Sequence, residues 1–128
     1  MIIRACCFLV AVALAFLKEA RAERKPWFLY VAFNAPHAPL QPLKADYQKY
    51  LGRYDAGWDA VRAARVAKQQ ALGLFGQAVE PSLRPEHIPA WSSLSAETRD
   101  WEARRMAAYA AMIDRVDQEV GRLVADLR

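Results

Sequence analysis

The sequence predicts an α/β fold that is mainly helical, with one strand and a long C-terminal helix. The strand is predicted from WFLYVAF, the run from Trp27 to Phe33, in which seven aromatic or aliphatic residues follow one another. Such a run is typical of a strand covered on both faces, as in a parallel sheet. The long helix is predicted because apolar side chains recur every three or four residues between Tyr109 and Leu127.

The composition is that of one folded domain. The chain has 128 residues, of which 55% are hydrophobic and 25% are charged, and this argues against disorder. The net charge is +4. Most Arg and Lys residues alternate with acidic residues or Ala, as in residues 62–68 and 99–105. This pattern indicates solvated helix faces, so we expect no nucleic-acid partner.

The first 22 residues permit two interpretations. Arg4, the apolar run ACCFLVAVALAFL and then ARA follow the order of a secretory signal peptide, which would make the protein periplasmic or secreted. The run is too short for a stable membrane span. Alternatively, AVALAFLKEARAERK is an internal helix of a cytoplasmic protein. It would pack its Leu/Phe side on a sheet and leave Lys18, Glu19 and Arg21 in solvent.

The remaining elements follow from breaks and caps. Three prolines after the strand predict an extended or turning loop, and a short helix is expected from Ala45 to Leu51. Helix formers predict a second helix from Trp58 to Leu72, and an irregular connection is expected over residues 74–94. Ser95 is the expected N-cap of the long helix, with Glu97 in its first turn. No second strand is predicted, so the partners of the strand are expected outside these residues.

His37 is the main candidate for chemistry. It lies just past the carboxyl end of the predicted strand, where open α/β sheets bind ligands, and Pro36 and Pro39 restrict the backbone around it. A histidine there could donate to an anionic oxygen or pass a proton to a leaving group. On spacing alone, a loop histidine hydrogen-bonded to backbone is the favoured interpretation, because lone histidines are common.

The other candidates have plainer explanations. His87 is interpreted as a surface or packing residue, and Asp55 and Asp59 line a substrate cleft or serve a turn and a cap. No HExxH pair or ligand cluster predicts a metal site, and the adjacent Cys6 and Cys7 do not suit a disulfide. Four serines lack a nearby base and are interpreted as structural: Ser82, Ser92, Ser93 and Ser95.

Several motifs together resemble one enzyme family. KPWFLYVAFNAPHAPLQP, residues 25–42, closely resembles the arylsulfatase segment KPFFLYxAFxAPHxPLQ. The resemblance continues, in the same order over about 100 residues, through KYLGRYDAGWDAVRAAR, IPAWSSLSAE and EARRMAAYAAMIDRVDQEVGRL. It implies a sulfatase of the alkaline-phosphatase-like α/β superfamily, which hydrolyses sulfate esters. It also favours the internal-helix interpretation of residues 1–22, because family members have a helix before this strand.

The resemblance implies particular chemistry. The family uses a formylglycine made from the Cys or Ser of a C/S-x-P-x-R motif, and calcium or another divalent cation that binds the sulfate. Its APHxP histidine contacts the sulfate ester at the leaving oxygen, and this residue matches His37. The sequence contains no C-x-P-x-R or S-x-P-x-R, and the family's metal-binding aspartates are also missing. We therefore expect no nucleophile or metal ligand from this chain.

These departures predict a partial sulfatase catalytic domain over residues 1–128. Its expected parts are a helix or signal-like segment (1–22), a strand with the histidine loop (26–42), an insertion with a helix and a Pro-rich connection (43–94) and the long helix (95–128). The chain alone would be inactive, and its partner would be the remainder of a sulfatase. The alternatives are a non-catalytic helical protein that docks through the strand and the 109–127 stripe, or a small exported protein.

Overall fold

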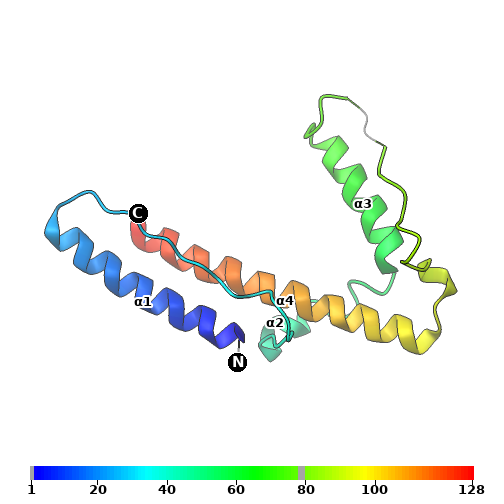
Figure 1. The fold of residues 1–128 in the computed structure, drawn as a ribbon, viewed down its shortest axis with the longest axis horizontal. Helices are drawn as coiled ribbons and strands as arrows, with labels where there is room; N and C mark the ends of the chain where they lie inside the picture. The colour runs from blue at the N-terminus through cyan, green and yellow to red at the C-terminus, as the bar shows by residue number, and fades with distance from the viewer. Residues whose placement is uncertain (1, 78–79) are drawn as a thin grey trace. The chain divides into compact units, whose positions relative to one another are not determined.

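The structure is a computed structural model that describes residues 2–77 and 80–128. The helices are α1 (Ile2–Glu23), α2 (Lys44–Gln48), α3 (Gly57–Ala71) and α4 (Ala96–Leu127), with a 3-10 helix, η1, at Trp91–Ser93 (Figure 1). The chain forms two compact units. The first unit comprises Met1–Tyr50 and Ala107–Arg128, the second comprises Leu51–Met106, and α4 contributes to both.

The first unit is built on two helices that run side by side in the same direction, α1 and the C-terminal part of α4 (Figure 1). Near the start of α1, Cys6 packs with Met112, and further along Leu17 packs with Leu123. The spacing of the buried α1 residues places them on one face of the helix. These residues are Cys6, Val10, Ala13 and Leu17.

The predicted Leu/Phe side of the first helix is therefore only partly correct. Leu17 is buried, whereas Phe8 and Phe16 are exposed. Lys18, Glu19 and Arg21 are exposed, as predicted, and the Arg21 guanidinium also lies 2.9 Å from a carboxylate oxygen of Asp126. Among the described residues, no helix combines the length and the apolar character that crossing a bilayer requires.

The strand predicted from Trp27 to Phe33 is wrong for this structure, since residues 2–77 and 80–128 contain no strand. The segment 26–34 is extended but irregular, and it runs along α1 and α4 in the opposite direction (Figure 1). Its side chains alternate as an extended backbone requires. Leu29 and Val31 pack on the helices, whereas Phe28 and Tyr30 are 91% and 81% exposed.

The missing ladder explains this error. A strand exists only where its amide and carbonyl groups pair with a neighbour. No backbone hydrogen bond joins residues 26–33 to any other described residue. The apolar run therefore has the predicted extended conformation but forms no sheet, and the prediction that both of its faces are covered is wrong, because Phe28 and Tyr30 are exposed.

α4 confirms the predicted long helix and its cap. Ser95 Oγ accepts a hydrogen bond from the backbone N–H of Thr98 at 3.1 Å, and Glu97 lies in the first turn. The predicted apolar stripe is only partly buried: Met112 and Leu123 are in the core, and Val116 is partly buried. The other members stay at least 38% exposed: Tyr109, Ile113, Val120, Val124 and Leu127.

Candidate functional site

The histidine loop is attached to the first unit on both sides of His37. Before it, Ala35 is buried against Cys6 and Met112. After it, Leu40 and Leu43 pack against the same cluster, and the backbone N–H of Gln41 donates to Met112 Sδ at 3.3 Å. The short segment between these attachments is held at both ends.

His37 itself is exposed at the outer part of this loop. Its backbone N–H donates to the carbonyl of Asn34 at 3.0 Å, and Nδ1 lies 2.6 Å from the carbonyl oxygen of Ala38. A carbonyl only accepts hydrogen bonds, so Nδ1 carries a proton. Nε2 makes no hydrogen bond to the described residues. The ring is thus oriented by the backbone, and Nε2 is available to an external group.

A buried carboxylate follows the loop on α2. Asp46 is 1% exposed, although α2 has only five residues. Its Oδ1 accepts hydrogen bonds from Lys49 Nζ at 3.0 Å and Gln118 Nε2 at 3.2 Å. Its Oδ2 accepts from Arg115, whose Nε and Nη2 both lie 2.8 Å away. The carboxylate is therefore fully engaged and joins α2 to α4.

The donors around Asp46 are themselves paired. Asp114 accepts from Lys49 at 2.9 Å and from Gln118 at 3.0 Å, and buried Glu119 accepts from Arg122 at 2.6 Å. Sequence spacing predicts Arg115/Glu119 and Arg122/Asp126 as weak surface pairs. The first pair is long, at 3.8 Å, and in place of the second Asp126 pairs with Arg21. We call this set the carboxylate network: Asp46, Lys49, Asp114, Arg115, Gln118, Glu119 and Arg122.

The network changes the acidity of its members. Burial raises the pKa of Asp46, but hydrogen bonds from Lys49, Gln118 and Arg115 outweigh this effect and leave the pKa below its usual value. The hydrogen bond from Lys49, followed by that from Gln118, likewise lowers the pKa of Asp114. On α1, burial and then a hydrogen bond to Glu119 raise the pKa of the Cys7 thiol. A raised pKa lowers the fraction of the reactive thiolate form of Cys7.

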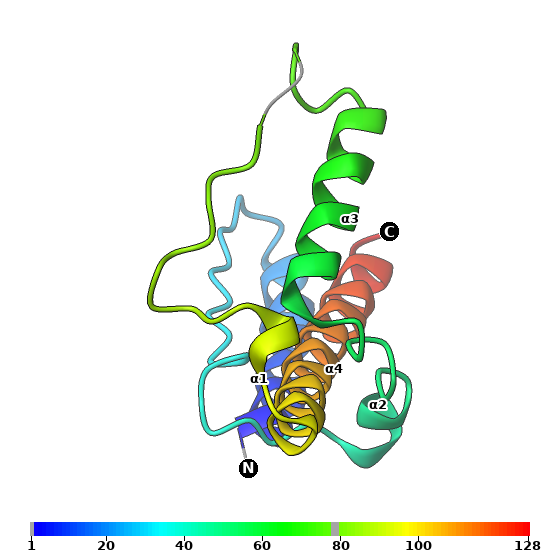
Figure 2. The ribbon, with the colours of Figure 1, turned by 90° about the vertical axis from the view of Figure 1, so that its right-hand side faces the viewer.

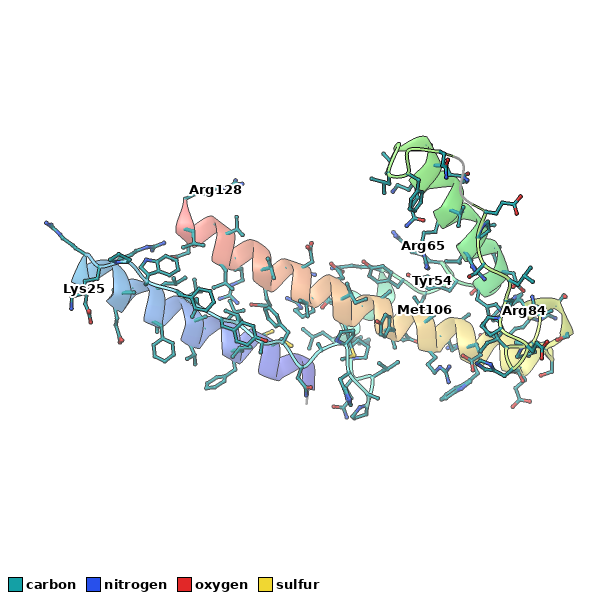
Figure 3. The ribbon with its side chains drawn as sticks, turned by 45° about the horizontal axis from the view of Figure 1, so that its top comes forward. Lys25, Tyr54, Arg65, Arg84, Met106 and Arg128 are labelled. Carbon is teal, nitrogen blue, oxygen red and sulfur yellow. The ribbon has the colours of Figure 1, made fainter. Side chains whose placement is uncertain are left out.

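Asp59, a candidate from the sequence, has a structural role in the second unit. Its Oδ2 accepts the backbone N–H of Trp91 at 2.9 Å, and its Oδ1 accepts from Arg84 Nη1 at 3.0 Å. The Trp91 hydrogen bond is the main cause that lowers the pKa of Asp59. Figure 3 labels Arg84 beside the N-terminal end of α3. Asp59 thus joins the Pro-rich connection to α3, and it does not cap α3, whose N-cap is Ala56.

Two tryptophans complete this arrangement. The rings of Trp58 and Trp91 meet edge to face with centroids 4.8 Å apart, and Trp58 Nε1 donates to the carbonyl of Pro89 at 3.2 Å. Gly57 has a φ of +82°, and a Cβ there would lie 2.1 Å from the Trp91 ring. Figure 2 shows η1 close to the start of α3. We call these residues the tryptophan clasp: Gly57, Trp58, Asp59, Arg84 and Trp91.

The remaining candidates have no chemical setting. His87 is exposed, as predicted for a surface residue, and so is Asp55. Ser82 accepts from Arg62 and Ser93 donates to the carbonyl of Ala90. Within residues 2–77 and 80–128, no three His, Cys, Asp or Glu side chains gather as a metal site needs. The described residues thus do not assemble the ligand set that the resemblance implies for calcium.

Comparison with known proteins supports the motifs quoted above. The sequence model of the family described as "Sulfatase" matches residues 8–128. The chain belongs to the sulfatase family. It is 37% identical over 109 residues to an uncharacterised sulfatase of Schizosaccharomyces pombe, an alignment that covers 84% of this chain and 20% of that protein. It is 33% identical over 110 residues to an arylsulfatase of Klebsiella aerogenes, covering 86% and 24%.

Family membership fixes the coarse classification. Sulfatases have an alkaline-phosphatase-like α/β fold and are sulfuric ester hydrolases. The alternative of a non-catalytic helical protein is not favoured. The chain spans only 20% to 24% of the length of these two curated sulfatases.

Sequence reasoning singled out His37, whose role stays a prediction, and missed the carboxylate network. Asp46 and Arg115 are 69 residues apart, and each is an ordinary charged residue on a predicted helix. The local sequence offers one indication of the network. Leu40 and Leu43 lead into α2, and such apolar residues indicate that the start of α2 packs against a core.

Proposed function

We propose that this chain supplies the histidine loop of a sulfuric ester hydrolase of the arylsulfatase type. The substrate is a sulfate ester of a small molecule, and His37 contacts it on the side of the leaving group. The formylglycine nucleophile and the ligands of the calcium or other divalent cation are supplied by residues other than these 128. When bound, such a cation would offset the negative charge of the sulfate.

The geometry of the His37 ring is the observation that carries this proposal. Nδ1–H is occupied by the Ala38 carbonyl at 2.6 Å, so Nε2 is the ring nitrogen left for an external oxygen. In the imidazolium form, Nε2–H donates to the bridging ester oxygen. As the sulfur–oxygen bond breaks, that proton moves from Nε2 to the departing oxygen, which leaves as a neutral alcohol. The ring is then neutral, with its remaining proton on Nδ1.

The surroundings of His37 support an exposed functional histidine rather than a structural one. A structural histidine is normally buried with both ring nitrogens engaged. His37 is exposed, and only Nδ1 is bonded, to the next residue along the chain. The loop that carries it is nevertheless fixed at both ends by buried apolar residues. Preorganised donors of this kind stabilise developing charge without a cost in reorganisation.

Turnover of an aryl sulfate tests this function. The 128-residue chain with calcium is expected to give no release of 4-nitrophenol from 4-nitrophenyl sulfate. In an active enzyme that contains this sequence, His37→Ala is expected to lower kcat by about 10² to 10⁴-fold, the usual contribution of a general acid. His87→Ala is the matched control and should leave kcat unchanged. An undiminished kcat in His37→Ala would disprove the role of His37, and turnover by the chain alone would disprove its dependence on other residues.

A further inference from the structure

The exit of the histidine loop depends on contacts made by α2. This helix has five residues and no side-chain hydrogen bond at its N-cap, Leu43. A helix of this length is unstable by itself in water. Its position is therefore set by the side chains that it places against the rest of the first unit, chiefly Leu43 and Asp46.

Asp46 makes the polar part of this attachment. Its carboxylate is the acceptor for donors on α4, Arg115 and Gln118, and for Lys49 just beyond α2. Arg115 places two N–H groups on one carboxylate oxygen, which fixes direction as well as distance. Removing one partner of such a buried ion pair costs free energy, because the other charge is left uncompensated.

The donors that receive Asp46 are preorganised. Asp114 holds Gln118 and Lys49 from the far side, and Glu119 lies 3.8 Å from Arg115. The donors thus have partners that restrict their rotamers, and Asp46 enters a site whose geometry is already defined. On the other side of the loop, Ala35 is fixed in the apolar cluster. Together with Leu40 and Leu43, Asp46 therefore fixes the C-terminal end of the segment between Ala35 and α2.

We propose that Asp46, held by Arg115, is a positioning residue for His37. By fixing the loop exit, it keeps the Ala38 carbonyl where it accepts the Nδ1 proton, and this directs Nε2 away from the backbone. The purpose of this positioning rests on the proposed function of His37. The structural effect on the ring does not, so the two fail separately.

The imidazole nitrogens of His37 report this effect directly. The 128-residue chain contains only two histidines, and His87, in the second unit, serves as an internal reference. Long-range ¹H–¹⁵N NMR of the labelled chain near pH ~8, where an ordinary imidazole is neutral, distinguishes a proton on Nδ1 from one on Nε2. The unsubstituted chain is expected to hold the His37 proton on Nδ1.

Two substitutions of the network and one control complete the experiment. Asp46→Asn should shift the two His37 nitrogen resonances toward those of free histidine, and Arg115→Lys should shift them less in the same direction. The His87 resonances should stay unchanged in both. Asp100→Asn removes the exposed Arg104–Asp100 pair of the second unit and should move neither histidine.

Each outcome decides the proposal. His37 resonances that stay unchanged in both network variants, with helical circular dichroism retained, would overturn it. If Asp46→Asn loses helical signal, Arg115→Lys gives the answer. If both unfold while Asp100→Asn folds, the network is a general stabiliser, which also overturns the proposal. If the NMR shifts appear but His37→Ala keeps full turnover, the positioning stands and the proposed function fails.

Discussion

At the scale of single residues, His37 and Asp46 lie in the same stretch of sequence but have opposite surroundings. His37 is exposed and has one ring nitrogen without a bond to the described residues, whereas Asp46 is 1% exposed and accepts from three side chains. The difference follows from where each lies relative to the apolar cluster of Cys6, Ala35 and Met112. The loop places His37 in solvent, whereas α2 places Asp46 back against the core.

The buried carboxylate predicts how acid affects stability. The pKa of Asp46 in the folded chain lies below its usual value of 3.8, so the ion pair stabilises the fold fully above that value. This stability is lost as the pH falls through the lower folded pKa. Asp46→Ala is expected to lower the free energy of unfolding by about 3 kcal/mol at pH 7 and to flatten its acid dependence. Thermal unfolding followed by circular dichroism between pH 7 and pH ~2 measures both effects.

The control for this prediction is Asp100→Ala. Asp100 pairs with Arg104 on the exposed surface of α4, where an ion pair contributes little. It should change the unfolding free energy by less than about 0.5 kcal/mol at pH 7. An equal loss in both variants would contradict the assignment of Asp46 as a buried, fully engaged carboxylate.

At the scale of elements, the extended segment and the tryptophan clasp illustrate what local pattern does and does not specify. The apolar run from Trp27 to Phe33 correctly predicts an extended chain, but the helices cover only one of the two faces that were predicted to be buried. It does not provide a neighbour for the backbone. In the second unit, the helix that begins near Trp58 was predicted from its helix formers, but the contact of Trp58 with Trp91 was not. That contact joins residues more than 30 positions apart in the sequence.

Alternation along the extended segment gives a testable difference between adjacent residues. Leu29 packs on the core of α1 and α4, whereas Phe28 is 91% exposed. Leu29→Ser is expected to cost about 2 kcal/mol of unfolding free energy, and Phe28→Ser less than about 0.5 kcal/mol. Urea denaturation of the two variants measures the difference. The reverse order of costs would place the opposite face of the segment on the helices.

Two glycines with opposite surroundings test the tryptophan clasp. Gly57 has a positive φ, and an added Cβ would meet the Trp91 ring at 2.1 Å, so Gly57→Ala should be destabilising by at least about 2 kcal/mol. It should also change the near-ultraviolet circular dichroism of the Trp58–Trp91 pair. Gly121 lies within α4 with nothing within 4 Å of an added Cβ. Gly121→Ala should therefore stabilise the chain, by about 1 kcal/mol.

A stable Gly57→Ala variant with an unchanged aromatic signal would show that the two tryptophans do not pack as described. A destabilising Gly121→Ala would point to a contact on that face of α4.

At the scale of the whole molecule, the family of the chain is established, whereas its chemistry is proposed. The sulfatase family is established by a match over residues 8–128, and it implies an alkaline-phosphatase-like α/β fold. The two helices of the first unit run in the same direction, and the extended segment runs opposite to both. This is how crossover helices lie against a strand in α/β folds, because each connection returns the chain to the same end.

The proposed sharing of the active site predicts what surrounds this sequence in the genome. The coding DNA upstream is expected to encode a C-x-P-x-R or S-x-P-x-R segment, and the DNA downstream a Ser-Asp-Asn-Gly segment. These would supply the formylglycine and a metal ligand that the 128 residues do not contain. Sequencing of the flanking regions tests this. Unrelated genes on both sides would oppose the proposal, and mass spectrometry of the mature N-terminus would test the separate prediction about residues 1–22.

The sequence by itself determined the helices, the Ser95 cap and the extended conformation of residues 27–33, because propensity, capping and short motifs act between residues close along the chain. It also singled out His37, whose role stays a proposal. Only the tertiary structure decided that the extended segment lacks a ladder, that Phe16 is exposed while Leu17 is buried, and that Asp46 is held by Arg115. Hydrogen-bond partners and buried ion pairs depend on which distant segments meet. A local sequence pattern does not specify which distant segments come into contact.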